Sequence, residues 1–213
     1  MAEQDTGAVL AGTGDAQVAA LSALADRVRE LTEAVLFTDA PPAELAAVSA
    51  ELEALTARLS ASRRPGLPDA VLGPDGMPYQ PASPVTGALN PIAPPVEFTA
   101  DPDGTVRSTV TLSAVYEGPP SYVHGGVSAM ILDHLLGMAA AVNGTPGMTA
   151  TLDLRYRRPT PWDVPLTVEG RVTRTEGRKT WADGWIRTPD SKTTVEATAM
   201  FVSPKPPAPA PWA

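Results

Sequence analysis

The chain has 213 residues, a formal net charge of −8 and no cysteine. This charge argues against binding to nucleic acid or to an anionic membrane, both of which need a basic surface. The lack of cysteine excludes disulfides, thiolate metal sites and a cysteine nucleophile. The two histidines, His124 and His134, would point about 80° apart on one helix, a poor metal pair, so we expect no metal site.

Residues 1–64 are expected to form a helical hairpin extension. Apolar residues recur every three or four positions, first from Leu21 to Val35 and again from Leu45 to Leu59. This spacing puts the apolar side chains of each helix on one face. Asp39 is a candidate cap for the second helix. Two lone helices cannot bury both stripes, so we expect them to pack on the main domain or on a dimer partner.

Residues 65–95 hold nine of the 24 prolines, which excludes regular structure and predicts a linker or a strap over the next domain. Residues 204–213 are expected to be a disordered, proline-rich tail. The first residues, MAEQDTGAVLAG, do not resemble a signal peptide. The apolar stretch 127–142 is short for a membrane span and carries Asp133 and His134 at its centre. We therefore expect a cytoplasmic protein.

Residues 96–203 show the patterns of one strand, then one helix, then four further strands. Even-numbered residues from 106 to 116 predict one face of a strand, and residues 125–143 predict a long, almost wholly apolar helix. Four further strands follow, near 150–156, 166–172, 179–187 and 195–201, with a hairpin turn at Glu176-Gly177. An apolar helix should be buried, and short turns imply antiparallel neighbours. The expected fold is therefore α+β, an antiparallel sheet wrapped around one buried helix.

The predicted helix carries the residues that suggest chemistry. It opens with Gly125 and Gly126, and Asp133 lies in its middle, within the sequence VHGGVSAMILDHLLGMAAAVN. Backbone N–H groups at a helix start are open to a ligand. Burial of a carboxylate on an apolar helix costs free energy, so its presence suggests a function. Gly126 and Asp133 share a face but lie about 10 Å apart along the axis, too far to act on one carbonyl. A second, antiparallel helix could complete each site, which predicts an obligate dimer.

This pattern resembles the hot-dog fold. It is similar to the acyl-CoA thioesterases of the 4-hydroxybenzoyl-CoA thioesterase superfamily, especially the phenylacetate-pathway type. The resemblance covers residues 96–203 and rests on His-Gly-Gly with an acid nine residues after the histidine, on LDLRYRRP, and on the Glu-Gly-Arg-Lys turn. It implies a homodimer or a dimer of dimers with sites at the interface. It also implies no cofactor, because coenzyme A is part of the acyl-CoA substrate.

The resemblance implies a role for each matching residue. The Gly126 amide would polarise the thioester carbonyl, and Gly125 would shape the turn. Asp133 would act as general base or as nucleophile, and the sequence cannot choose between them. Thr149 would hydrogen-bond near the nucleophile or its water. His124 would orient the helix start.

A basic group lies among the same motifs. On an acidic protein, a cluster of Arg157, Arg158, Arg178 and Lys179 suits the phosphates of coenzyme A. The alternative is an ordinary solvated rim of charges.

Three functions remain open at this point. The leading prediction is an acyl-CoA thioesterase, which releases a free acid and coenzyme A. A hot-dog dehydratase or hydratase would instead need histidine and carboxylate as proton-transfer partners. The third is a non-enzymatic acyl-CoA-binding or scaffold protein that recruits a partner through the helical hairpin. The identity of the acyl group cannot be read from the sequence.

Overall fold

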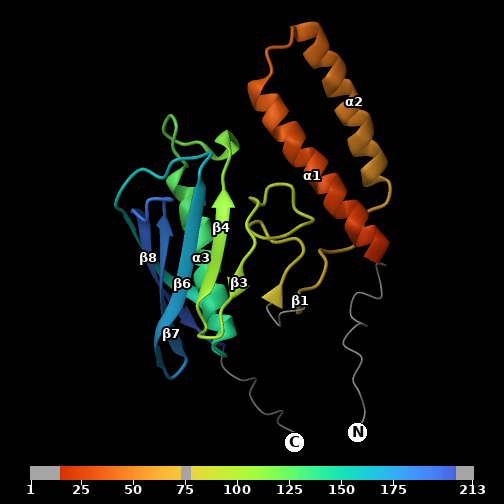
Figure 1. The fold of residues 1–213 in the computed structure, drawn as a ribbon. Coiled ribbons are helices and arrows are strands. Elements are labelled where there is room, and N and C mark those ends of the chain that lie inside the picture. Colours follow the sequence, from red (N-terminus) through yellow and green to blue (C-terminus); the bar gives the residue numbers. More distant parts are fainter. Residues whose placement is uncertain (1–14, 73–77, 205–213) are drawn as a thin grey trace, which may run out of the picture.

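An antiparallel sheet wraps around one long helix in the computed structural model, which describes residues 15–72 and 78–204 (Figure 1). The helices are α1 (Asp15–Phe37), α2 (Pro42–Ser60), the 3-10 turn η1 (Ala114–Tyr116) and α3 (Gly125–Val142). The strands are β1 (Val71–Leu72), β2 (Pro78–Tyr79), β3 (Thr99–Ala100), β4 (Val106–Thr111), β5 (Met148–Tyr156), β6 (Pro165–Glu176), β7 (Lys179–Arg187) and β8 (Thr193–Val202). The predicted tail 204–213 lies outside the described residues, except for Pro204.

The main sheet has six strands in the order β3-β4-β6-β7-β8-β5, and all its pairs are antiparallel. β6 and β7 form the predicted hairpin, in which Gly177 adopts a φ of +57° that suits glycine. β4 alternates buried and exposed residues as predicted. However, the strand ends at Thr111 and not at Tyr116, because Ser113 caps the η1 turn by accepting from the Val115 N–H.

α3 is the buried helix that the sequence predicts. Seven of its residues are buried: Ser128, Ile131, Leu132, Leu135, Leu136, Ala139 and Ala140. It lies on the sheet and contacts β6, β7 and β8. Among the described residues, α3 is also the one helix with the length and apolar composition of a membrane span, a property shared by the core helix of a soluble domain. These observations confirm the α+β hot-dog fold.

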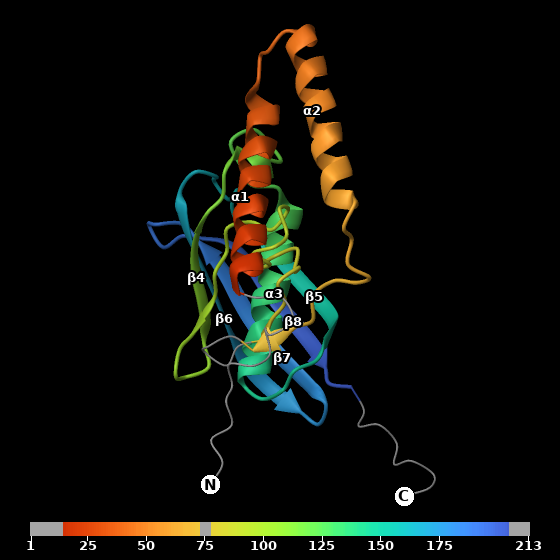
Figure 2. The same ribbon diagram turned by 90° about the vertical axis from the view of Figure 1, so that its right-hand side faces the viewer.

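The N-terminal hairpin forms as predicted, with one correction and one unfinished surface. Pro41 and not Asp39 occupies the N-cap position of α2, and no side chain caps this helix. α1 lies beside the domain near η1, whereas α2 stands farther out (Figures 1 and 2). Ala25 of α1 is buried, but α2 has no buried residue. The packing of α2 on a dimer partner therefore stays a prediction.

The described part of the proline-rich segment is a strap and not a free linker. It contains the paired two-residue strands β1 and β2, so the expectation that this segment has no regular structure is wrong. Ser83 accepts hydrogen bonds from the backbone N–H groups of Val85 and Thr86, which folds the segment into a compact loop. Val85 of this segment belongs to the main hydrophobic core. The strap therefore lies over the domain as part of its packed structure.

Candidate active site

The glycine pair lies at the start of α3, where a side chain holds one of the first backbone amides. His124 is the N-cap residue, and its Nδ1 accepts a hydrogen bond of 3.0 Å from the Gly126 N–H. The ring therefore uses Nδ1 as an acceptor, which leaves Nε2 to carry the proton of the neutral ring. A Cβ on Gly126 would lie 3.1 Å from the same Nδ1, so glycine allows the cap to fold this closely. His124 thus caps the start of α3, and its functional role stays a prediction.

A tyrosine that the sequence did not single out as a site residue holds the other side of this turn. The Tyr156 hydroxyl donates a hydrogen bond of 3.0 Å to the Gly125 carbonyl. A Cβ on Gly125 would lie 3.1 Å from Cε1 of the same ring. Tyr156 ends β5 within the LDLRYRRP motif, but the motif does not show that the hydroxyl reaches back to α3. The Tyr156 ring therefore packs closely on Gly125, and the predicted role of Gly125 in the site stays a prediction.

The two glycine amides differ in their availability. In this structure the Gly126 N–H is occupied by the His124 ring. The Gly125 N–H has no hydrogen-bond partner within residues 15–72 and 78–204. A carbonyl oxygen could thus approach Gly125 directly, whereas Gly126 would have to release His124 first. The assignment of Gly126 as the donor stays a prediction, and the turn offers Gly125 as a second donor.

Asp133 and Thr149 come together although they lie on different elements. Asp133 is half-buried in the middle of α3, and Thr149 lies near the start of β5. The Thr149 hydroxyl donates a hydrogen bond of 2.9 Å to Asp133 Oδ1. A bulge between Thr149 and Thr151 interrupts the pairing of β5 with β8. Such bulges re-aim a side chain, here towards the helix. Within the described residues, the other carboxylate oxygen of Asp133 accepts no hydrogen bond from a side chain.

The carboxylate and the helix start form two separate groups within one chain. No hydrogen bond in the described chain joins Asp133 to the turn formed by His124, Gly125 and Gly126. This separation follows from the seven residues between Gly126 and Asp133, which amount to about 10 Å of helix. One chain therefore presents an acid with its threonine, and a donor turn with its tyrosine, but not both at one point.

His134 takes no part in either group. Its Nε2 lies 3.2 Å from the Thr86 hydroxyl of the strap, and its ring stacks on Phe98 at a centroid distance of 5.9 Å. Burial lowers the pKa of His134, and the neighbouring Asp133 opposes this effect. A neutral histidine that holds the strap against α3 is therefore a structural residue.

The predicted basic cluster does not form within one chain. Arg157 pairs with Glu196 at 2.8 Å and Arg158 donates to the Thr193 carbonyl, both at the start of β8. Arg178 donates to the Ser203 carbonyl beyond the other end of β8, and Lys179 pairs in register with Val202. Seven residues of strand separate these ends, which is about 23 Å. A single chain therefore has two basic groups.

Comparisons with known proteins agree with this fold. Residues 121–199 match the family model of the thioesterase superfamily. The crystal structure of a thioesterase superfamily protein is 41% identical with a TM-score of 0.78, over 85% of this chain and 94% of that chain. The acyl-coenzyme A thioesterases THEM4 of Xenopus laevis and Mus musculus are 37% and 38% identical over 87 residues, 40% of this chain. That match covers 39% and 37% of their lengths, so the chain spans about two fifths of these curated relatives. The chain belongs to the thioesterase superfamily.

Proposed function

We propose that this protein hydrolyses an acyl-CoA thioester to a free carboxylic acid and coenzyme A. The observation that carries the proposal is the hydrogen bond from Thr149 to Asp133, which orients a carboxylate on an otherwise apolar helix. Membership of the thioesterase superfamily supports it, and so do the similar proteins named acyl-coenzyme A thioesterases. Coenzyme A enters as part of the substrate, and the chemistry needs no resident cofactor.

The proposed reaction uses the two groups of the site in complementary roles. As a general base, Asp133 takes a proton from water while the water oxygen bonds to the thioester carbon. As a nucleophile, Asp133 bonds to that carbon itself, and water then hydrolyses the resulting anhydride. In both routes the C–S bond breaks and the sulfur leaves as the thiolate of coenzyme A. A backbone N–H of Gly125 or Gly126 stabilises the negative carbonyl oxygen, an effect worth roughly 3–4 kcal/mol.

A dimer would bring the two groups together through β5. This strand pairs only with β8 in the described chain, so its other edge is open, and Met148 and Tyr156 at its ends are 79% and 55% exposed. Antiparallel pairing of two copies about Leu152 would place Thr149 near Tyr156 of the partner subunit. The acid of one chain would then face the donor turn of the other.

The same pairing would reunite the basic residues. Arg178 and Lys179 lie at the Met148 end of the sheet, and Arg157 lies at the Tyr156 end. Antiparallel β5 strands place each end beside the opposite end of the partner. Each composite site would then have positive charge from both chains, which suits the phosphates of coenzyme A.

Thiol release from a panel of acyl-CoA substrates tests this function. We expect the parent protein to release thiol and the Asp133→Ala variant to lose at least a hundredfold in kcat, with an unchanged dimer on size measurement. Asp183→Ala is a matched control, because Asp183 accepts a similar hydrogen bond of 2.7 Å from Thr198 on the two adjacent strands β7 and β8. We expect this variant to keep its activity.

Three results would contradict the proposal. Unchanged turnover in Asp133→Ala would remove this residue from the mechanism. An active monomer would exclude the composite site. No thiol release from any acyl-CoA, together with a changing enoyl-CoA absorbance, would favour a dehydratase.

A further inference from the structure

A large cavity lies between the N-terminal extension and the domain, away from the acid. Its volume is about 620 Å³, within the range of about 300–1,000 Å³ that small-molecule sites occupy. The lining is chiefly apolar and includes Val28 and Thr32 of α1, Pro91 and Ile92 of the strap, Thr111 of β4, and Val115 and Tyr116 of η1. The extension therefore builds a concave apolar site that the hot-dog domain alone would lack.

One wall of this cavity is joined directly to the donor turn of the active site. The Tyr116 carbonyl accepts a hydrogen bond of 2.8 Å from the His124 N–H. The Tyr116 side chain lines the cavity, and burial raises the pKa of its hydroxyl. Tyr116 thus joins the wall of the cavity to the start of α3.

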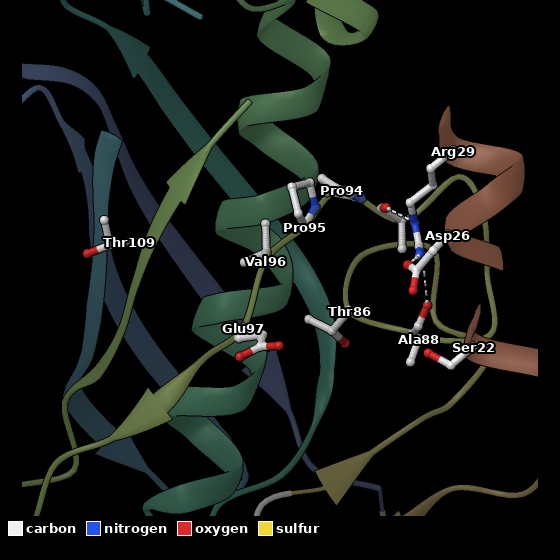
Figure 3. Close-up of a pocket in the computed structure, with 12 residues that line it drawn as sticks. Ser22, Asp26, Arg29, Thr86, Ala88, Pro94, Pro95, Val96, Glu97 and Thr109 are labelled. Atoms are coloured by element: carbon white, nitrogen blue, oxygen red, sulfur yellow. Dashed lines mark hydrogen bonds and ion pairs between the residues drawn. The ribbon is translucent and has the colours of Figure 1, made fainter. Parts of the chain in front are cut away.

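The opposite wall is held in place by Arg29 of α1. Its guanidinium donates to the carbonyls of Asn90 (2.8 Å) and Ala93 (3.3 Å) of the strap, and pairs with Asp26 at 2.6 Å. Figure 3 shows Arg29 and Asp26 beside the strap in an adjoining cavity of about 400 Å³, which shares Arg29 and Pro95 with the larger one. These contacts fix the strap to α1 and keep the larger cavity open.

The charges around the cavity favour an uncharged chain over an anion. Glu30 and Glu33 contribute to the lining, and Glu30 pairs with Arg27 at 2.7 Å. The cation in the lining, Arg29, is already paired with Asp26 and two carbonyls. A carboxylate placed beside Glu30 and Glu33 would be repelled. The end of a thioester acyl chain carries no charge.

We propose that this cavity receives the aliphatic acyl chain of the substrate, so that α1 and the strap take part in selecting the length of that chain. The proposal rests on the proposed thioesterase function. A free fatty acid has the same aliphatic chain and could also bind in the cavity, and the test below distinguishes it from the acyl chain of the thioester.

The test places a tryptophan in the cavity from α1 or from the strap and measures how kcat/KM depends on the length of the acyl chain. In the parent protein, kcat/KM should rise about fourfold per methylene from acetyl-CoA to decanoyl-CoA, the effect of burying each CH₂. Val28→Trp should lower kcat/KM for decanoyl-CoA at least tenfold more than it lowers kcat/KM for acetyl-CoA. Ile92→Trp, which acts from the strap at a side chain that is 69% exposed, should do the same. Leu24→Trp is the control on α1, because Leu24 is 38% exposed and lies outside this cavity.

Calorimetry measures binding of the substrate and so tests the acyl-chain proposal without turnover. Decanoyl-CoA should bind the Asp133→Ala variant at least tenfold more tightly than coenzyme A does, and Val28→Trp in that background should remove the difference. This arm applies even if no thioester is hydrolysed, so the two proposals can fail separately. A parent chain-length preference that both tryptophan variants retain would overturn the inference. Tight binding of decanoate that Val28→Trp abolishes, with hydrolysis unaffected, would assign the cavity to free fatty acids and overturn the acyl-chain assignment.

Discussion

Two glycines in the sheet allow α3 to approach it closely, and this contact supports a quantitative prediction. Gly170 of β6 and Gly184 of β7 are register partners beneath α3. A Cβ on Gly170 would lie 2.8 Å from Leu135 Cδ2 and 2.9 Å from Leu136 Cδ2. Both leucines have no exposed surface, so their ends cannot swing into solvent. Restoring ordinary contact requires each to retreat by about half an ångström into a packed core.

The Gly170→Ala variant should therefore be less stable than the parent protein. Overpacking of this kind costs about 1–3 kcal/mol of unfolding free energy, which corresponds to a Tm lower by roughly 2–12 °C in a protein of this size. Urea denaturation with an unchanged m value, together with thermal unfolding, measures the effect.

Gly66→Ala is the control, because no atom lies within 4 Å of the added Cβ. Its stability should stay within about 0.5 kcal/mol of the parent. If Gly170→Ala also unfolds within that margin of the parent, the close approach of α3 does not depend on this glycine and the reasoning is wrong.

Three other contacts give predictions of their own. Thr149→Val removes the hydrogen bond to Asp133, so kcat should fall about 10- to 100-fold, the value of roughly 1.5–3 kcal/mol for a bond to a charged group, while Thr149→Ser should keep most of the thiol release. Arg29→Met leaves the Asn90 and Ala93 carbonyls without their donor, so limited proteolysis should cut the strap faster while size measurement stays unchanged. His134 has a lowered pKa in the folded chain, so the unfolded chain binds more protons; the Tm should fall as pH drops below the ordinary histidine value of about 6.5, and less steeply in His134→Gln.

The central fold could be predicted because its signals are local and periodic. Apolar residues alternate along β4 because one face of the strand packs against α3. The observed burial of β4 follows the same alternation, residue by residue. The apolar composition of α3 required burial, and the Glu176-Gly177 pair marked the hairpin whose φ of +57° only glycine adopts easily. In each case the physical constraint acts within a few residues, so the sequence displays it.

Features that depend on contacts between distant segments escaped prediction. The strap is fixed by Arg29, whose carbonyl partners lie 61 and 64 residues away, and backbone carbonyls leave no mark in a sequence. Tyr156 likewise reaches a carbonyl 31 residues away. The failed Asp39 cap is different, because local competition decided it: Pro42 begins the helix, so the N-cap position falls to Pro41.

The donor turn shows how a motif can locate a site without assigning its atoms. His-Gly-Gly predicts open amides at the start of α3, and the sequence treats the two glycines alike apart from their order. The helix cap makes the two glycines differ. The His124 ring accepts a hydrogen bond from the Gly126 N–H, whereas the Gly125 N–H has no partner among the described residues. A thioester carbonyl that binds Gly126 must therefore displace an existing hydrogen bond, at a cost of about 0.5–1.5 kcal/mol, whereas one that binds Gly125 need not. On this energetic ground the first glycine is the stronger candidate for the oxyanion donor, provided that the Tyr156 hydroxyl continues to hold its carbonyl.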